Sequence, residues 1–182
     1  KRAFDHLVSL ENLGAHVDEL VSYYLWADDI GPDGQPRRTT SDMFFAEVRP
    51  FEEIFREGQA PDPNAQQQQQ PGQQGQNAAE KLAELQKQII TATWNIQRRE
   101  TGKTPTANFK PDAATVKESQ ENALEQVRSR IEQSEDPRAQ ALLQTVEKEM
   151  AEAVEHLTDA ADDNSPKALP PALSAEQSAY QA

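Results

Sequence analysis

The sequence predicts an α+β chain built in segments, with strands first, then a linker and then helices. Residues 1–57 contain eight aromatic side chains, many of them in alternating patterns. Residues 58–78 contain none, and carry nine glutamines, three prolines and three glycines. Residues 79–163 repeat apolar side chains every three or four positions, which is the period of an α-helix. Residues 164–182 are predicted to form a proline-containing tail.

Residues 1–57 are interpreted as the C-terminal part of an immunoglobulin- or fibronectin-like β-sandwich. Three strands are expected, at residues 6–10, 20–27 and 43–48, because apolar and polar residues alternate there. The middle strand is apolar on both faces, as in the interior of a covered sheet. Proline and glycine in the sequence Gly-Pro-Asp-Gly at residues 31–34 predict a turn. Residues 51–57 are expected to form a short helical turn.

The segment 58–78 is interpreted as a disordered linker. It contains glutamine, proline, glycine, alanine and a few small polar residues, including five consecutive glutamines. Such a segment cannot bury enough apolar surface to offset the entropy lost when its backbone becomes ordered.

The region 79–163 is predicted to form a helical hairpin or a three-helix, coiled-coil-like structure. Helices are expected at about residues 79–100, 113–133 and 137–161. The third has the clearest start signal, because Asp136 can cap it and Pro137 suits the first helical position. Only residues 134–136 separate the last two helices, so these should be antiparallel neighbours.

Each predicted helix carries one apolar stripe. The first stripe is Leu82, Leu85, Ile89, Ala92 and Ile96. The second is Val116, Gln120, Leu124, Val127 and Ile131, and the third is Ala139, Leu143, Val146, Met150, Ala153, Leu157 and Ala160. Such stripes suit either an intramolecular bundle or contact with a partner helix. For a contact between chains we select Ile89, Trp94, Ile96, Val146, Met150 and Leu157, although Trp94 also suits a packing anchor.

Composition excludes several classes of function. The formal net charge is −13, spread along the chain, which disfavours nucleic acid and anionic membrane surfaces. Cysteine is absent, so disulfides, thiolate metal sites and cysteine nucleophiles are excluded. No apolar run approaches the roughly 18 residues of a membrane span. The chain begins at Lys1, and we expect it to be an internal piece of a longer protein.

Catalytic motifs are not found in the sequence. The three histidines, His6, His16 and His156, occur outside any HExxH, GxSxG or P-loop pattern and are interpreted as surface or half-buried residues. Arg98 and Arg99 could contact a phosphate, but basic residues are also typical of a helix C-terminus. We therefore expect no enzyme activity and no cofactor.

An acidic loop offers a weak metal site. The candidate ligands, all carboxylates around the predicted turn, are Asp28, Asp29, Asp33 and Asp42. They could hold calcium or help to bind a glycan, but the EF-hand pattern fails because Thr40 stands where a glutamate is required. Arg37 and Arg38 follow in the same segment and could neutralise the acids, which favours a solvated turn.

Two stretches, residues 21–56 and 86–100, give the chain a resemblance to a known group. The first reads VSYYLWADDIGPDGQPRRTTSDMFFAEVRPFEEIFR and the second QKQIITATWNIQRRE. They resemble large uncharacterised envelope proteins of planctomycete-type bacteria. The resemblance implies a membrane anchor outside this chain and a long extracytoplasmic region that ends its sandwich domain with a strand, a GPDG turn and another strand. It implies no catalytic residue.

From the sequence, the chain is therefore expected to be a non-enzymatic structural or protein-interaction segment of a membrane-anchored envelope protein, located on the extracytoplasmic side. It would act as a scaffold or tether that binds a protein partner or itself through the helical stripes. The alternatives are a sandwich module that binds calcium or a glycan through residues 28–42, and an enzyme whose active site lies outside this chain.

Overall fold

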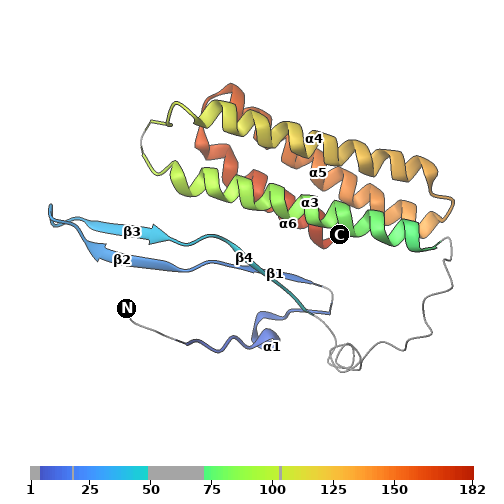
Figure 1. Cartoon of the computed structure of the whole chain (residues 1–182), viewed down its shortest axis with the longest axis horizontal. Coiled ribbons are helices and arrows are strands. Elements are labelled where there is room, and N and C mark those ends of the chain that lie inside the picture. Colours follow the sequence, from blue (N-terminus) through green and yellow to red (C-terminus); the bar gives the residue numbers. More distant parts are fainter. Residues whose placement is uncertain (1–4, 18, 49–71, 103) are drawn as a thin grey trace, which may run out of the picture. The chain divides into compact units, whose positions relative to one another are not determined.

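The computed structural model describes residues 5–17, 19–48, 72–102 and 104–182 (Figure 1). It confirms the α+β class, with four short strands followed by a bundle of four helices. The chain divides into two compact units. The first contains Lys1–Tyr23 and Phe44–Gln68, and the second contains Tyr24–Met43 and Gln69–Ala182. The expected helical turn at 51–57 lies outside the described residues.

The first unit contains the short helix α1 (Leu10–Leu13) and a two-stranded sheet. Strand β1 (Leu20–Tyr23) pairs antiparallel with β4 (Phe44–Glu47), and the rings of Tyr23 and Phe44 stack at a centroid distance of 5.5 Å. The strand predicted at residues 6–10 is wrong, because residues 5–9 have no regular structure and Leu10 begins α1. The caps explain this: the Ser9 side chain accepts a hydrogen bond from the Asn12 amide, and Gly14 ends the helix at a φ of 67°.

The second unit begins with a β-hairpin, β2 (Trp26–Ile30) and β3 (Pro36–Thr40), paired antiparallel. The predicted turn is confirmed: the Gly34 amide donates to the Gly31 carbonyl at 2.9 Å, and Gly34 has a φ of 75°. The single strand predicted at residues 20–27 is instead divided between β1 and β2. In the described part of the chain the four strands form two separate two-stranded sheets, whereas a sandwich needs about seven strands.

Four helices make up the rest of the second unit. They are α3 (Gly72–Arg99), α4 (Phe109–Gln133), α5 (Pro137–Asp162) and α6 (Leu169–Gln181), with a 3-10 turn, η1 (Pro166–Ala168), before α6. In cyclic order α3, α4, α5 and α6 each pack against the next, and α6 packs against α3 (Figure 1). The bundle therefore has four helices, rather than the two or three that were predicted.

Prolines explain the differences in helix boundaries. The predicted tail 164–182 contains η1 and α6, which have prolines in their first turns. Likewise α4 begins at Phe109, four residues before the predicted start, with Asn108 at its N-cap, so that Pro111 lies in its first turn. First-turn amides have no partner within the helix, so proline costs little there. At the other end of the region, α3 begins at Gly72, within the predicted linker, whose residues 58–71 are not described.

The start of α5 is as predicted. The Asp136 side chain accepts a hydrogen bond from the Arg138 amide at 3.0 Å, with Pro137 at the first helical position. The three-residue connection after α4 places α4 and α5 side by side. The core between the helices is built mainly from fully buried alanine and larger apolar side chains, among them Ile90, Phe109, Val127, Met150, Leu157 and Leu169.

Candidate functional site

The residues predicted to contact a partner are mostly inside the bundle. Ile89, Trp94, Ile96, Met150 and Leu157 are between 0% and 6% exposed, and Val146 is half-buried. The surface they were expected to form is therefore not available to another chain. The physical reason is α6, whose buried side chains supply the fourth apolar face and close the bundle within one polypeptide.

The four aspartates of the predicted metal site each have a separate partner. Asp28 and Arg38 form a bidentate ion pair with two oxygen–nitrogen distances of 2.7 Å, and Asp29 pairs with Arg37 in the same way. Asp33 accepts a hydrogen bond from the Gln35 amide, and Asp42 lies 2.8 Å from Arg98.

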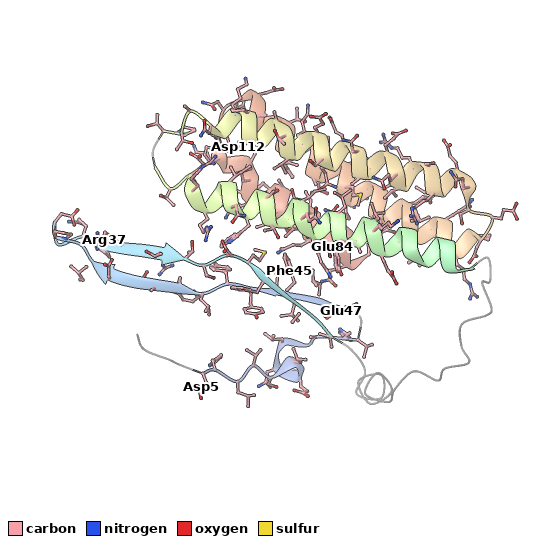
Figure 2. All side chains as sticks on the ribbon, in the orientation of Figure 1. Asp5, Arg37, Phe45, Glu47, Glu84 and Asp112 are labelled. Carbon is pink, nitrogen blue, oxygen red and sulfur yellow. The ribbon has the colours of Figure 1, made fainter. Side chains whose placement is uncertain are left out.

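The sequence favoured a solvated turn that included the two arginines, but the arginines do not lie in a turn. They lie on β3, directly opposite the two aspartates on β2 (Figure 2 labels Arg37). Hydrogen bonds from Arg38 hold the pKa of Asp28 below its usual value. Because each of the four carboxylates has its own partner, they do not converge on a cation. No group of three metal-ligating side chains occurs among the residues that the structure describes.

Helix α3 anchors the end of the hairpin. The Trp94 ring nitrogen donates to the Ser41 carbonyl at 3.2 Å, and the Trp94 ring lies 4.4 Å from that of Tyr24. One turn further along, Arg98 donates to the Thr40 carbonyl and pairs with Asp42. Trp94 is therefore a packing anchor. Arg98, considered from the sequence as a phosphate contact or as a basic residue typical of a helix C-terminus, also holds the hairpin.

The hairpin and Leu25, which directly precedes it, carry large apolar side chains on the surface. Leu25 is 47% exposed, Trp26 58% and Ile30 74%. The Arg38 guanidinium lies 5.3 Å from the centre of the Trp26 ring. More than half of the Trp26 surface nevertheless remains exposed. Tryptophan is enriched at protein interfaces relative to the rest of the protein surface, so the exposed Trp26 suits a contact surface.

A polar layer crosses the core of the bundle. Its four members, Gln86, Thr93, Gln120 and Glu176, are at most 1% exposed. The side-chain amides of Gln86 and Gln120 exchange two hydrogen bonds, of 3.1 and 3.2 Å. Thr93 Oγ1 lies 2.6 Å from Glu176 Oε1, while Glu176 Oε2 is buried without a partner among the described residues.

Burial determines the charge of Glu176. Removal from water raises its pKa to about 8, and the hydrogen bond with Thr93 offsets only part of that rise. The carboxyl is therefore mainly neutral at pH 7. Sequence reasoning missed this residue because it lay in the predicted tail, whereas Gln120 was visible as a polar residue within an apolar stripe.

A second buried carboxylate holds the connection between α3 and α4. Glu100, 8% exposed, accepts hydrogen bonds from the Thr106 amide at 2.8 Å and its hydroxyl at 2.6 Å, and pairs with Arg99. Burial alone would raise the pKa of Glu100, but these donors lower it below the usual value. Arg99 also reaches Asp112, labelled at the start of α4 in Figure 2. This network ties the two helices together, so Arg99 has a structural role.

Two of the histidines form local pairs on the surface. His16 lies 3.0 Å from Glu19, and His156 lies 3.8 Å from Glu152 one turn away on α5. His6 is exposed. Neither pair includes a hydroxyl group that the imidazole could activate.

Comparisons with protein-family models, curated proteins and solved structures give no match to this chain. Among the described helices, none combines the length and the apolar character that crossing a bilayer requires. The candidate features for function are therefore the exposed hairpin and the interior of the bundle.

The paired glutamines give a testable prediction. We expect Gln120→Leu to lower the free energy of unfolding by about 1–3 kcal/mol, because it leaves the buried side-chain oxygen of Gln86 without a donor. The double change Gln86→Leu and Gln120→Leu should cost less than Gln120→Leu alone, since no amide is then left unpaired. Urea unfolding followed by circular dichroism measures both, with Gln88→Leu on the exposed face of α3 as the control. Additive costs in the double variant would contradict the pairing.

Proposed function

We propose that this chain is a non-enzymatic, protein-interaction segment of a larger bacterial envelope protein. The bundle acts as a rigid support, and the β2–β3 hairpin presents the contact surface. The observation that carries the proposal is the exposure of Leu25, Trp26 and Ile30 on a hairpin that Trp94 and Arg98 hold in place. Rigidly positioned aromatic side chains are typical anchors of protein interfaces.

The partner surface is formed by β-strands. A two-stranded sheet is marginally stable alone, and its open edges can pair with a further strand. We propose that the strands of this chain belong to an immunoglobulin- or fibronectin-like sandwich, whose remaining strands come from the adjoining part of the full-length protein. The apolar side chains of the hairpin support this, because a covering sheet would bury them.

The envelope setting rests on the resemblance carried by residues 21–56 and 86–100. On this proposal the full-length protein is anchored in the membrane by a segment outside this chain, and the chain lies on the extracytoplasmic side. The net charge of −13 supports a protein partner rather than nucleic acid.

The test measures binding between this chain and the polypeptide that adjoins it in the full-length protein. We expect a 1:1 complex by isothermal titration calorimetry. Because Trp26 and Ile30 are the most exposed apolar side chains of the hairpin, Trp26→Thr with Ile30→Thr should weaken binding at least about 30-fold. Leu142→Thr is the matched control, since Leu142 is 60% exposed but lies on α5.

Two results would count against the proposed function. One is a failure of the two polypeptides to bind, and the other is equal binding by the hairpin variant and the unchanged chain. Amide hydrogen exchange in β2 and β3 provides an independent measurement, because strand pairing should slow exchange in the complex.

A further inference from the structure

An apolar pocket opens at one end of the helical bundle. It lies where α3 and α5 begin and where α4 and α6 end, and its volume is about 240 Å³. Its apolar lining includes Leu82, Ala83, Leu143, Val146, Met150 and Ala179. An apolar cavity of about 150 Å³ stays dry and takes up benzene. The present pocket is therefore large enough for an apolar group of about eight carbons.

One charged side chain, Arg130, lines this pocket. Arg130 is half-buried, near the C-terminus of α4, and makes no hydrogen bond or ion pair through its side chain with any residue that the structure describes. By contrast Arg128, two residues earlier, pairs with Glu147 at 2.8 Å. A guanidinium remains charged at all ordinary pH values and binds carboxylates through two parallel hydrogen bonds. Arg130 therefore offers an unused anion-binding group beside an apolar space.

The other polar groups of the pocket are already occupied or neutral. The Gln86 side-chain amide is engaged with Gln120 and with the Glu176 carbonyl. The Tyr180 ring, which forms part of the wall, lies 5.2 Å from the Lys87 ammonium. No lining side chain is a carboxylate, and the α-carboxylate of Ala182, which also lines the pocket, makes no ion pair with Arg130 in the structure. A ligand with one negative charge and an apolar body matches this arrangement.

We propose that this pocket binds a small amphipathic monocarboxylate, such as a medium-chain fatty acid. The apolar body occupies the space between Leu82, Val146 and Met150, and its carboxylate pairs with Arg130. Burial of the apolar body of the ligand provides most of the binding free energy, and Arg130 selects the anion. This site is separate from the hairpin, and the proposal does not depend on the function proposed above.

The two methionines provide a direct readout. The chain contains only Met43 and Met150; Met150 lines the pocket and is 2% exposed, whereas Met43 does not line it. We expect octanoate, titrated into the whole chain labelled with methyl-¹³C methionine, to shift the Met150 resonance saturably. The dissociation constant should be on the order of 0.1 mM, which ten non-hydrogen atoms can supply. The Met43 resonance should stay in place and serves as the internal control.

Variants then separate the charge from the cavity. Arg130→Gln should weaken octanoate binding about tenfold or more while leaving octanol binding unchanged. Arg138→Gln is the matched control, because Arg138 is exposed, makes no side-chain ion pair with a described residue and lies outside the pocket. Ala83→Phe should block both ligands by filling the cavity, with circular dichroism to confirm that each variant is folded.

The outcomes decide the proposal as follows. A saturable Met150 shift that depends on Arg130 and is blocked by Ala83→Phe supports it. Absence of that shift, equal affinity for octanol and octanoate, or undiminished octanoate binding by folded Arg130→Gln would overturn it.

Discussion

Raising the pH from 5 to 8 is expected to lower the free energy of unfolding through a single buried group, Glu176. In the unfolded chain this carboxyl ionises near its usual pKa of 4.5, whereas burial raises the folded-state pKa to about 8. Between these values the folded state binds one more proton than the unfolded state, so stability falls as the pH rises. The slope is about 1.4 kcal/mol per pH unit, and the full effect is on the order of 5 kcal/mol. Below about pH 4.5 the full contribution to stability is retained.

Substitution by glutamine isolates this effect. Glu176→Gln cannot ionise, so the stability of the variant relative to that of the unchanged chain should rise by about 1.4 kcal/mol per pH unit from pH 5 to 8. At pH 5 the variant should be the less stable of the two by about 1–3 kcal/mol, because its amide nitrogen takes the place of Oε2, which is buried and makes no hydrogen bond with a described residue. The two curves are therefore expected to cross between pH 5 and 7, as measured by urea unfolding at fixed ionic strength.

Glu84→Gln is the matched control for the change of charge. Glu84, which is labelled in Figure 2, is exposed on α3. Its substitution should therefore leave the pH dependence of the stability almost unchanged. The causes of the raised pKa of Glu176 are burial, partly offset by the hydrogen bond with Thr93, and no charged side chain among the described residues contributes. Parallel pH profiles for Glu176→Gln and the unchanged chain would show that this carboxyl is already ionised or hydrated in the folded protein.

Much of the bundle could be predicted from the sequence, because helix periodicity is a local property. The stripes on α3, α4 and α5 and the cap at Asp136 were all visible in the chain. Helix α6 was not, because Pro170 and Pro171 suggested an irregular tail, although prolines are tolerated in a first helical turn. The error had a large consequence: without α6 the stripes lacked a fourth partner, so that contact with another chain stayed open beside an intramolecular bundle.

The strand region shows a different limit of sequence reasoning. Apolar character on both faces of residues 20–27 suggested a strand buried in a sandwich, but Trp26 and Leu25 are exposed in the structure. A local pattern indicates which side chains suit burial, and it does not show what covers them. The pairing of the two strands could have been found from the GPDG turn, but its register could not: centring on residues 31–34 would pair Asp28 with Arg37, whereas the observed connection is residues 31–35 and pairs Asp28 with Arg38. The pocket beside Arg130 could not have been predicted from the sequence, because it forms where the ends of four helices meet.

Truncation of Phe109 is expected to produce the second large effect. Phe109 is fully buried at the first position of α4 and belongs to the apolar core of the bundle. Phe109→Ala should lower the free energy of unfolding by about 3–5 kcal/mol, through lost burial and the cavity left behind. This is a large share of the 5–15 kcal/mol typical of a domain, so the urea midpoint of the helical signal at 222 nm should fall markedly.

This result also tests where α4 begins. The sequence placed the start of the helix at residue 113, which would leave Phe109 in a loop, where its truncation should cost little. The structure starts the helix four residues earlier and places the ring inside the core. Leu142→Ala is the control, because Leu142 is 60% exposed on α5 and should change stability by less than about 0.5 kcal/mol. If both variants changed stability equally little, the packing of Phe109 in the core would be wrong, because a fully buried ring cannot be removed without that loss.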